Sequence, residues 1–164
     1  MSTKPPIVIV MGLAGAGKST VGAALARALR WPFIDADDLH PAGNVEKMRR
    51  GIALTEADRA PWLDRLRARI DTLLAAEQPA VVACSALRRA YRAYLRADAV
   101  RFVYLKADYE LLRARLEARK HHFMNPTLLG SQAALLEEPT DAVVVDAALP
   151  VDEIVRHVRA ALAI

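Results

Sequence analysis

The feature that most limits the possible folds is a glycine-rich octapeptide near the N-terminus. Residues 12–19 read Gly-Leu-Ala-Gly-Ala-Gly-Lys-Ser, which fits the pattern G-x-x-x-x-G-K-[S/T]. Five apolar residues (7–11) precede it, and apolar side chains recur at helical spacing over residues 19–30. In such a strand–loop–helix setting the glycines let the backbone bend and direct its amides at an anion. The octapeptide therefore predicts a phosphate-binding loop at the end of the first strand of an α/β domain.

The same motif predicts a nucleoside triphosphate ligand, ATP, together with Mg²⁺. Its lysine reaches the β- and γ-phosphates, and its serine hydroxyl ligates the metal. The residues predicted to bind ATP here are Gly12, Leu13, Ala14, Gly15, Ala16, Gly17, Lys18, Ser19 and Thr20. The loop alone does not separate a kinase from a nucleotide-dependent switch.

Apolar runs of strand length alternate with helical patterns along the 164 residues. Further strands are expected at 33–34, 80–84, 102–105 and 143–145, and helices at 44–50, 55–74, 88–96, 108–119 and 151–162. This alternation predicts an α/β fold with a five-stranded, mainly parallel sheet in a single domain, residues 1–164. Residues 120–126 are polar and lack a strong period, which indicates a loop on the ligand side or a mobile lid.

Composition narrows the classes of ligand and the location. The net charge of +4 suits anionic ligands, but the basic residues are scattered and aromatics make up only 5%, so a nucleic-acid partner is not expected. The single cysteine, Cys84, excludes an internal disulfide and agrees with a reducing compartment. The apolar run 7–11 is too short for a signal segment or a membrane span, so we expect a cytoplasmic protein without a membrane partner.

Two carboxylates directly follow the second expected strand. Asp35 and Asp37 are two residues apart, so in extended backbone they point the same way, at the sheet edge where α/β proteins bind ligands. One carboxylate suits magnesium and the other suits the proton of an attacking hydroxyl. Helix capping or turn chemistry is the alternative reading. His40 is either a substrate contact or a surface or capping residue.

Arginines gather at three further places. Arg115 and Arg119 lie on the helix that leads into the polar segment, where a guanidinium stabilises the charge of a transferring phosphoryl group. The alternative is an ordinary solvated helix with Glu–Arg pairs. Arg59, Arg88 and Arg92 are expected near the ligand crevice, where an arginine can bind a substrate carboxylate.

Taken together, these segments resemble the gluconokinase family, of the thermoresistant type, along nearly the whole chain. Besides the phosphate loop, the matching segments are Asp35-Ala-Asp37, Leu39-His40-Pro41, Asn44-Val-Glu-Lys-Met48, Asp58-Arg59-Ala-Pro-Trp62-Leu63, Cys84-Ser-Ala-Leu87, Tyr91-Arg92, Arg115-Leu-Glu-Ala-Arg119-Lys120, His122-Phe-Met124, Leu128-Leu129, Ser131-Gln132 and Leu136-Glu137. The resemblance implies a three-layer P-loop NTPase fold with five parallel strands, helices on both faces and a mobile lid at about residues 119–137.

The resemblance also implies a reaction and a set of roles. The reaction is transfer of the ATP γ-phosphoryl to the 6-hydroxyl of D-gluconate, and homodimers are usual in the family. The implied catalytic residues are Lys18, Asp37 and Arg119; Arg115 and Arg119 join the ATP site, and Ser19 and Asp35 serve the metal. The implied substrate contacts are Asp37, His40, Arg59, Arg88 and Arg92.

The chain departs from the family pattern in its lid and near Arg88. His121 stands where the family has glycine, Asn125 where proline is common, and Arg88-Arg89 replace Lys-Lys. Two rival functions stay open: a kinase of shikimate or another small anion, and a non-catalytic nucleotide-binding module. Shikimate kinases lack the Leu-His-Pro and Cys-Ser-Ala-Leu segments, so they rank second.

Overall fold

A computed structural model describes residues 4–119 and 126–164 of the chain. Its sheet has five strands in the order β2-β3-β1-β4-β5, and every neighbouring pair is parallel. The strands are β1 (Ile7–Met11), β2 (Phe33–Asp35), β3 (Ala80–Ala83), β4 (Val100–Lys106) and β5 (Val143–Asp146). The predicted α/β class and the five-stranded parallel sheet are therefore confirmed.

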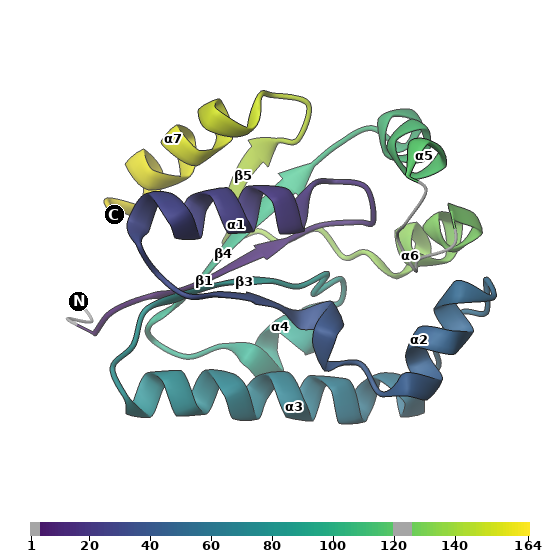
Figure 1. Ribbon diagram of the computed structural model, residues 1–164, viewed down its shortest axis with the longest axis horizontal. Coiled ribbons are helices and arrows are strands. Elements are labelled where there is room, and N and C mark those ends of the chain that lie inside the picture. The colour runs from purple at the N-terminus through teal and green to yellow at the C-terminus, as the bar shows by residue number, and fades with distance from the viewer. Residues whose placement is uncertain (1–3, 120–125) are drawn as a thin grey trace.

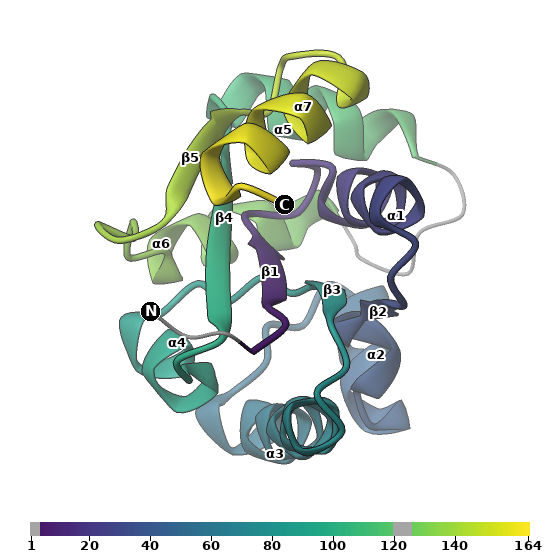
Figure 2. The ribbon, with the colours of Figure 1, turned by 90° about the vertical axis from the view of Figure 1, so that its left-hand side faces the viewer.

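Helices cover both faces of this sheet and complete the predicted three layers (Figures 1 and 2). In chain order they are α1 (Lys18–Leu29), α2 (Ala42–Arg49), α3 (Glu56–Ala75), α4 (Arg89–Leu95), α5 (Tyr109–Ala118), α6 (Leu129–Leu135) and α7 (Val151–Leu162). Helices α1, α5 and α7 lie on one side of the sheet, whereas α3 and α4 lie on the other, as Figure 2 shows. None of the helices within residues 4–119 and 126–164 is long and apolar enough to cross a membrane.

The central strand explains why the core has two halves. Successive side chains of a strand point to opposite faces, and all five residues of β1 are fully buried. Val8 and Val10 join the cluster under α1 and α7, while Ile7 and Ile9 join the cluster under α3 and α4. Burial on both faces accounts for the uninterrupted apolar run of β1, as expected in a parallel sheet.

The strand order places a crevice at the carboxyl end of β1. The chain passes from β1 through α1 to β2 on one side, whereas β4 and β5 lie on the other. Such a switch point is where open α/β sheets bind ligands. The helices α2, α5 and α6 gather around this end of the sheet (Figure 1). The fold thus brings the phosphate loop and the segments after β2 and β3 to one edge.

Two elements were not predicted from the sequence. The first is a 3₁₀ helix, Ala36–Leu39, which the Asp35 side chain caps by accepting from the Asp37 amide. The second is α6, preceded by the 3₁₀ turn Pro126–Leu128, inside the segment assigned to the lid. Asp108 does occupy the N-cap position of α5, but its side chain makes no capping hydrogen bond. The lid positions His121 and Asn125 lie outside the described residues.

Candidate active site

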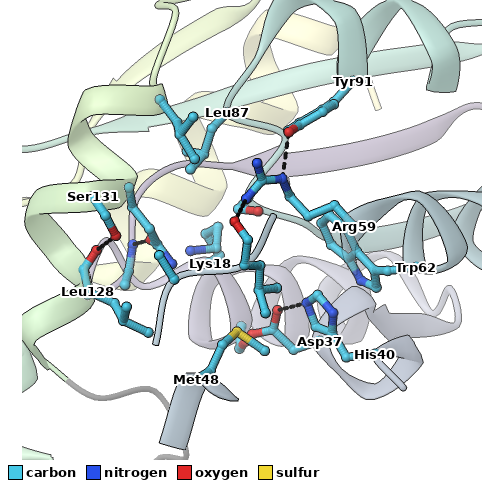
Figure 3. Close-up of a pocket in the computed structure, with 18 of the residues that line it drawn as sticks. Lys18, Asp37, His40, Met48, Arg59, Trp62, Leu87, Tyr91, Leu128 and Ser131 are labelled. Atoms are coloured by element: carbon cyan, nitrogen blue, oxygen red, sulfur yellow. Dashed lines mark hydrogen bonds and ion pairs between the residues drawn. The ribbon is translucent and has the colours of Figure 1, made fainter. Parts of the chain in front are cut away.

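A pocket opens at the carboxyl edge of the sheet, and most of the predicted site residues line it (Figure 3). Its wall includes Ala14, Gly15, Gly17, Lys18, Ser19, Asp37, His40, Met48, Leu54, Arg59, Trp62, Leu87, Tyr91, Arg119, Leu128, Ser131, Gln132 and Leu135. All three predicted catalytic residues are present in this set. Of the predicted ATP-binding residues, Gly12, Leu13, Ala16, Thr20 and Arg115 are not part of the wall.

Two glycines of the phosphate loop show why the motif needs them. Gly15 has a φ of 86°, and a Cβ there would lie 2.9 Å from the carbonyl oxygen of Leu112, so this residue lets α5 pack against the loop. Gly17 has a φ of 93°, yet no atom lies within 4 Å of its would-be Cβ. The loop is therefore closely packed at Gly15 and open to a ligand at Gly17.

Lys18 lies at the centre of the pocket. Its ammonium donates to the carbonyl oxygen of Leu13 at 3.0 Å, which holds the side chain along the loop. Burial lowers the pKa of Lys18, and the carboxylates of Asp37 and Asp35 act in the opposite direction. The lysine thus presents a cation between the loop and the acidic pair.

Ser19 and Asp35 meet across two elements of the fold. The Ser19 hydroxyl at the start of α1 donates to Asp35 Oδ2 at 2.6 Å. The other oxygen of Asp35 accepts from the Asp37 amide at 3.0 Å, so the Asp35 carboxylate holds both the Ser19 hydroxyl and the backbone of Asp37 in place. A hydroxyl and a carboxylate are the hard oxygen donors that Mg²⁺ takes together with waters, so this pair fits the predicted metal. Within the described ranges, no cluster of three or more His, Cys, Asp or Glu residues forms a further metal site.

The surroundings of Asp37 raise the pKa of its carboxyl group. Its side chain is 25% exposed, and burial raises its pKa to about 6, with the nearby Lys18 lowering it and Asp35 and Asp38 raising it. A carboxylate with a raised pKa inside a pocket is a candidate proton acceptor that is ionised near neutral pH.

His40 lies beside Asp37 and is stacked on Trp62. The two rings are 4.5 Å apart with a 10° angle between their planes, and Trp62 Nε1 donates to the carbonyl oxygen of Ala36 at 2.7 Å. His40 Nε2 is 3.9 Å from Asp37 Oδ1 (Figure 3). Burial lowers the pKa of His40 to about 4, so the ring is neutral at pH 7. The pocket therefore contains a neutral imidazole next to the carboxylate.

Arg59 is held in the pocket wall by Tyr91, which was named only within the family resemblance, and by Leu54 and Glu56, which were not named from the sequence. Its guanidinium donates to the Tyr91 hydroxyl at 2.6 Å, the Leu54 carbonyl at 2.7 Å and Glu56 Oε1 at 2.8 Å. The Tyr91 hydroxyl in turn donates to Glu56. Glu56 is the first residue of α3. Acidic residues are favoured in the first turn of a helix in any case, so the presence of Glu56 there did not indicate its contact with Arg59.

Arg88 and Arg92 do not line the pocket. Arg88 donates to Glu56 Oε1 at 2.9 Å from a half-exposed position. Arg92 is 3% exposed, and its guanidinium donates to the carbonyl oxygens of Ala86, Leu87 and Glu137. Ala86 has a left-handed φ of 46°, so Arg92 braces a loop with an unfavourable backbone angle. That either arginine contacts a substrate stays a prediction.

Removing this brace is expected to destabilise the fold. Arg92→Leu removes the guanidinium donor from the carbonyl oxygens of Ala86 and Glu137 and leaves Leu87 with only the Glu137 amide, which should lower the free energy of unfolding by about 2–4 kcal/mol. Urea denaturation measures the loss. The matched control is Arg89→Leu on the same helix, where the side chain is exposed and the change should stay within about 0.5 kcal/mol. Equal effects of the two substitutions would contradict the bracing role.

The two predicted nucleotide-side arginines are placed differently. Arg115 donates to the carbonyl oxygens of Gly15 and Ala16 in the loop and of Ala147 after β5, so it joins three segments. Arg119 ends α5, lines the pocket and lowers the pKa of Lys18 by its charge. Gln132 of α6 was named only within the family resemblance; its Oε1 accepts from the Ala14 amide at 3.2 Å.

Comparison with known proteins shows which family the chain belongs to. A profile of the family described as shikimate kinase matches residues 14–162. The gluconokinase of Gluconobacter oxydans (strain 621H) is 46% identical over 143 residues, covering 86% of this chain and 80% of that protein. The thermoresistant gluconokinase of Escherichia coli (strain K12) is 39% identical over 155 residues, covering 91% and 89%.

The chain belongs to the gluconokinase family. A crystal structure of a gluconokinase from Sinorhizobium meliloti 1021 superposes with a TM-score of 0.86 at 44% identity, covering 99% of this chain and 94% of that one. Membership in the gluconokinase family makes the chain an ATP-dependent phosphotransferase that acts on a hydroxyl group. The expected family and its P-loop kinase fold are confirmed, whereas the individual residue roles and the movement of the lid stay predictions.

Proposed function

We propose that this chain is a gluconokinase that transfers the γ-phosphoryl group of ATP to the 6-hydroxyl of D-gluconate. The products are ADP and 6-phospho-D-gluconate. The observation that carries the proposal is one pocket that combines the phosphate loop with a half-buried carboxylate, Asp37, and a fixed cation, Arg59. The relatives named gluconokinase support the choice of acceptor.

In the proposed reaction Asp37 accepts the proton of the 6-hydroxyl as that oxygen attacks the γ-phosphorus. The new O–P bond forms while the bond from phosphorus to the β–γ bridging oxygen breaks, and ADP leaves with that electron pair. Lys18 and Arg119 stabilise the negative charge on the oxygens of the moving phosphoryl group. The raised pKa of Asp37, about 6, supports the base role because such a carboxylate is ionised at pH 7 yet basic enough to take a proton.

Ser19 and Asp35 are the proposed holders of Mg²⁺, since their oxygens already lie 2.6 Å apart beside the phosphate loop. When bound, the metal neutralises charge on the phosphate oxygens. Arg115 is proposed to flank the adenine, because it lies between the loop carbonyls and Ala147. The nucleotide would thus extend from Ser19 towards the end of β5.

The acid and hydroxyl groups of gluconate are proposed to meet Arg59, His40 and Asp37. The guanidinium of Arg59 has five N–H groups and uses three of them for hydrogen bonds to protein groups. The other two are available for a substrate carboxylate. Arg88 and Arg92 are weaker proposals, since both donate to other parts of the chain.

A panel of acceptors tests this function. ADP release is measured with gluconate, shikimate, other aldonates and neutral glucose, and ³¹P NMR identifies the phosphorylated carbon. Gluconate should accelerate ADP release by at least about 100-fold over background hydrolysis, because a positioned base and acceptor act only when the hydroxyl is bound. Glucose lacks the carboxylate and should be a poor acceptor.

The other outcomes of the panel decide between the rivals. Acceleration by shikimate alone would make the chain a shikimate kinase, and ATP binding without any phosphorylated acceptor would leave a nucleotide-binding module. Either result rejects the gluconokinase proposal. A homodimer is also proposed, and the family resemblance supports it. A cytoplasmic location is proposed as well, and it is supported by the single cysteine, Cys84, which is a buried free thiol.

A further inference from the structure

Asn44 of α2 is a buried polar residue that touches His40 from behind the pocket. Its side-chain nitrogen donates to the carbonyl oxygen of Asp58 at 2.8 Å and lies 3.2 Å from His40 Nδ1. The residue is only 5% exposed. Because a backbone carbonyl oxygen can only accept, the Asn44 group next to Asp58 must be the NH₂ group. The orientation of the amide is therefore determined by its surroundings.

This orientation decides which nitrogen of His40 carries the proton. The second N–H of the Asn44 amide points at Nδ1, so Nδ1 is the acceptor of that bond. A neutral imidazole has one N–H, which must then be on Nε2. The ring is neutral at pH 7 because it is buried against Trp62, and that burial lowers its pKa to about 4.

The Nε2–H group faces the proposed base. It lies 3.9 Å from Asp37 Oδ1, and both residues line the pocket (Figure 3). The pair therefore offers one donor, on His40, next to one acceptor, on Asp37. A hydroxyl group fits both at once, because it can accept from the imidazole while it donates to the carboxylate. The opposite tautomer would present two acceptors, and a hydroxyl could satisfy only one of them.

We propose that Asn44 is a positioning residue that keeps His40 in the Nε2–H tautomer, so that His40 and Asp37 together bind and orient the hydroxyl that is phosphorylated. This inference rests on the proposed function for the identity of the acceptor. It goes beyond that function because it names His40 and Asp37 as the pair that recognises the hydroxyl, and the buried amide of Asn44 as the group that sets the tautomer of His40. Asn44 itself does not line the pocket, so it acts through His40.

A purely structural role for Asn44 is the competing explanation. The residue joins α2 to the first turn of α3, where Asp58 also accepts from Lys47 at 2.8 Å and completes the capping box with Thr55. Loss of Asn44 would therefore disturb packing as well as the tautomer. The test needs readouts that packing alone does not move.

The first readout is the tautomer in the intact protein. Long-range ¹H–¹⁵N NMR of the ¹⁵N-labelled protein, with His40 assigned by its absence in His40→Gln, distinguishes a protonated from an unprotonated ring nitrogen. At pH 7 we expect Nδ1 unprotonated and Nε2 protonated. Protonation of Nδ1, or of both nitrogens, would overturn the proposal. This outcome does not depend on which acceptor the enzyme uses, so it is separate from the acceptor panel.

The second readout compares two replacements of His40. The amide nitrogen of Gln reaches the position of Nε2, whereas that of Asn reaches only the position of Nδ1, and both lose the ring stack on Trp62 equally. His40→Gln should keep kcat/KM for gluconate within about 10-fold, and His40→Asn should lower it about 100-fold, the range expected for one lost hydrogen bond in a buried site. Equal losses would contradict the need for a donor at Nε2.

Asn44→Asp provides the third readout. A carboxylate accepts and cannot donate to Nδ1, so the proton of His40 should move to Nδ1 in the NMR spectrum. KM for gluconate should rise or kcat fall about 10- to 100-fold while KM for ATP stays within about 2-fold. An unchanged tautomer together with unchanged gluconate kinetics in the folded variant would overturn the proposal.

Discussion

Asp37→Asn is expected to lower kcat by about 10³-fold, because the amide cannot accept the proton of the attacking hydroxyl. The affinity for ATP should stay nearly intact, since Lys18 and the backbone of the phosphate loop are retained. Steady-state kinetics and equilibrium ATP binding measure the two effects. Asp38→Asn is the matched control, because Asp38 is exposed and does not line the pocket. Unchanged turnover of Asp37→Asn would remove Asp37 from the base role.

The same variant should be more stable than the parent protein at pH 8. The pKa of Asp37 is raised from 3.8 to about 6, mainly by burial, so the folded protein holds this carboxylate ionised at a cost above pH 6. This free-energy cost decreases as the pH falls from about 6 to 3.8 and is absent below pH 3.8. Asn removes the charge and should raise the free energy of unfolding by about 1–3 kcal/mol at pH 8. A gain in stability together with a loss of turnover separates catalytic loss from misfolding.

Lys18→Met is the second substitution with a large expected effect. It removes a cation from the developing charge of the phosphoryl group, and kcat should fall about 10²- to 10³-fold. Lys18 also lowers the pKa of Asp37, so its removal should raise that pKa above about 6. Because Asp37 must be ionised to act as base, the acid limb of the pH–rate profile should shift to higher pH.

Initial rates at limiting concentrations of both substrates report the ionisations of the free enzyme and so measure this shift. In the parent protein, the rate should fall as the pH drops through about 6. Lys106→Met is the control, since Lys106 is exposed on β4 and pairs with Glu138. If Lys18→Met left the acid limb at the same pH, the titrating group would not be Asp37 next to Lys18.

The sequence was most informative where function depends on contiguous residues. The phosphate loop is one octapeptide between a strand and a helix, so its glycines, Lys18 and Ser19 could be placed before any tertiary structure was known. Asp35 and Asp37 were equally accessible, because parallel strands end at one sheet edge. Helix α6 was missed, since among its seven residues only Leu129 is buried and no amphipathic period results.

Side-chain partners from distant segments could not be inferred in this way. From their sequence positions, Arg59 and Arg92 were both expected near the ligand crevice. Arg59 does line the pocket, whereas Arg92 is buried and donates to the carbonyl oxygens of Ala86, Leu87 and Glu137. Asn44 was named only within the family resemblance, and its role was not foreseen because that role depends on the positions of Asp58 and His40 in three dimensions. Such contacts are set by packing between helices and loops, which leaves no fixed spacing along the chain.

A crystal structure with a non-hydrolysable ATP analogue, Mg²⁺ and gluconate tests the central claim most directly. The account predicts the 6-hydroxyl oxygen at about 2.6–3.2 Å from the Asp37 carboxylate and in line with the γ-phosphorus, with Ser19 and Asp35 on the metal side. A complex in which Asp35 and Asp37 face away from the terminal phosphorus, or in which the carboxylate end of gluconate lies next to Asp37, would contradict it.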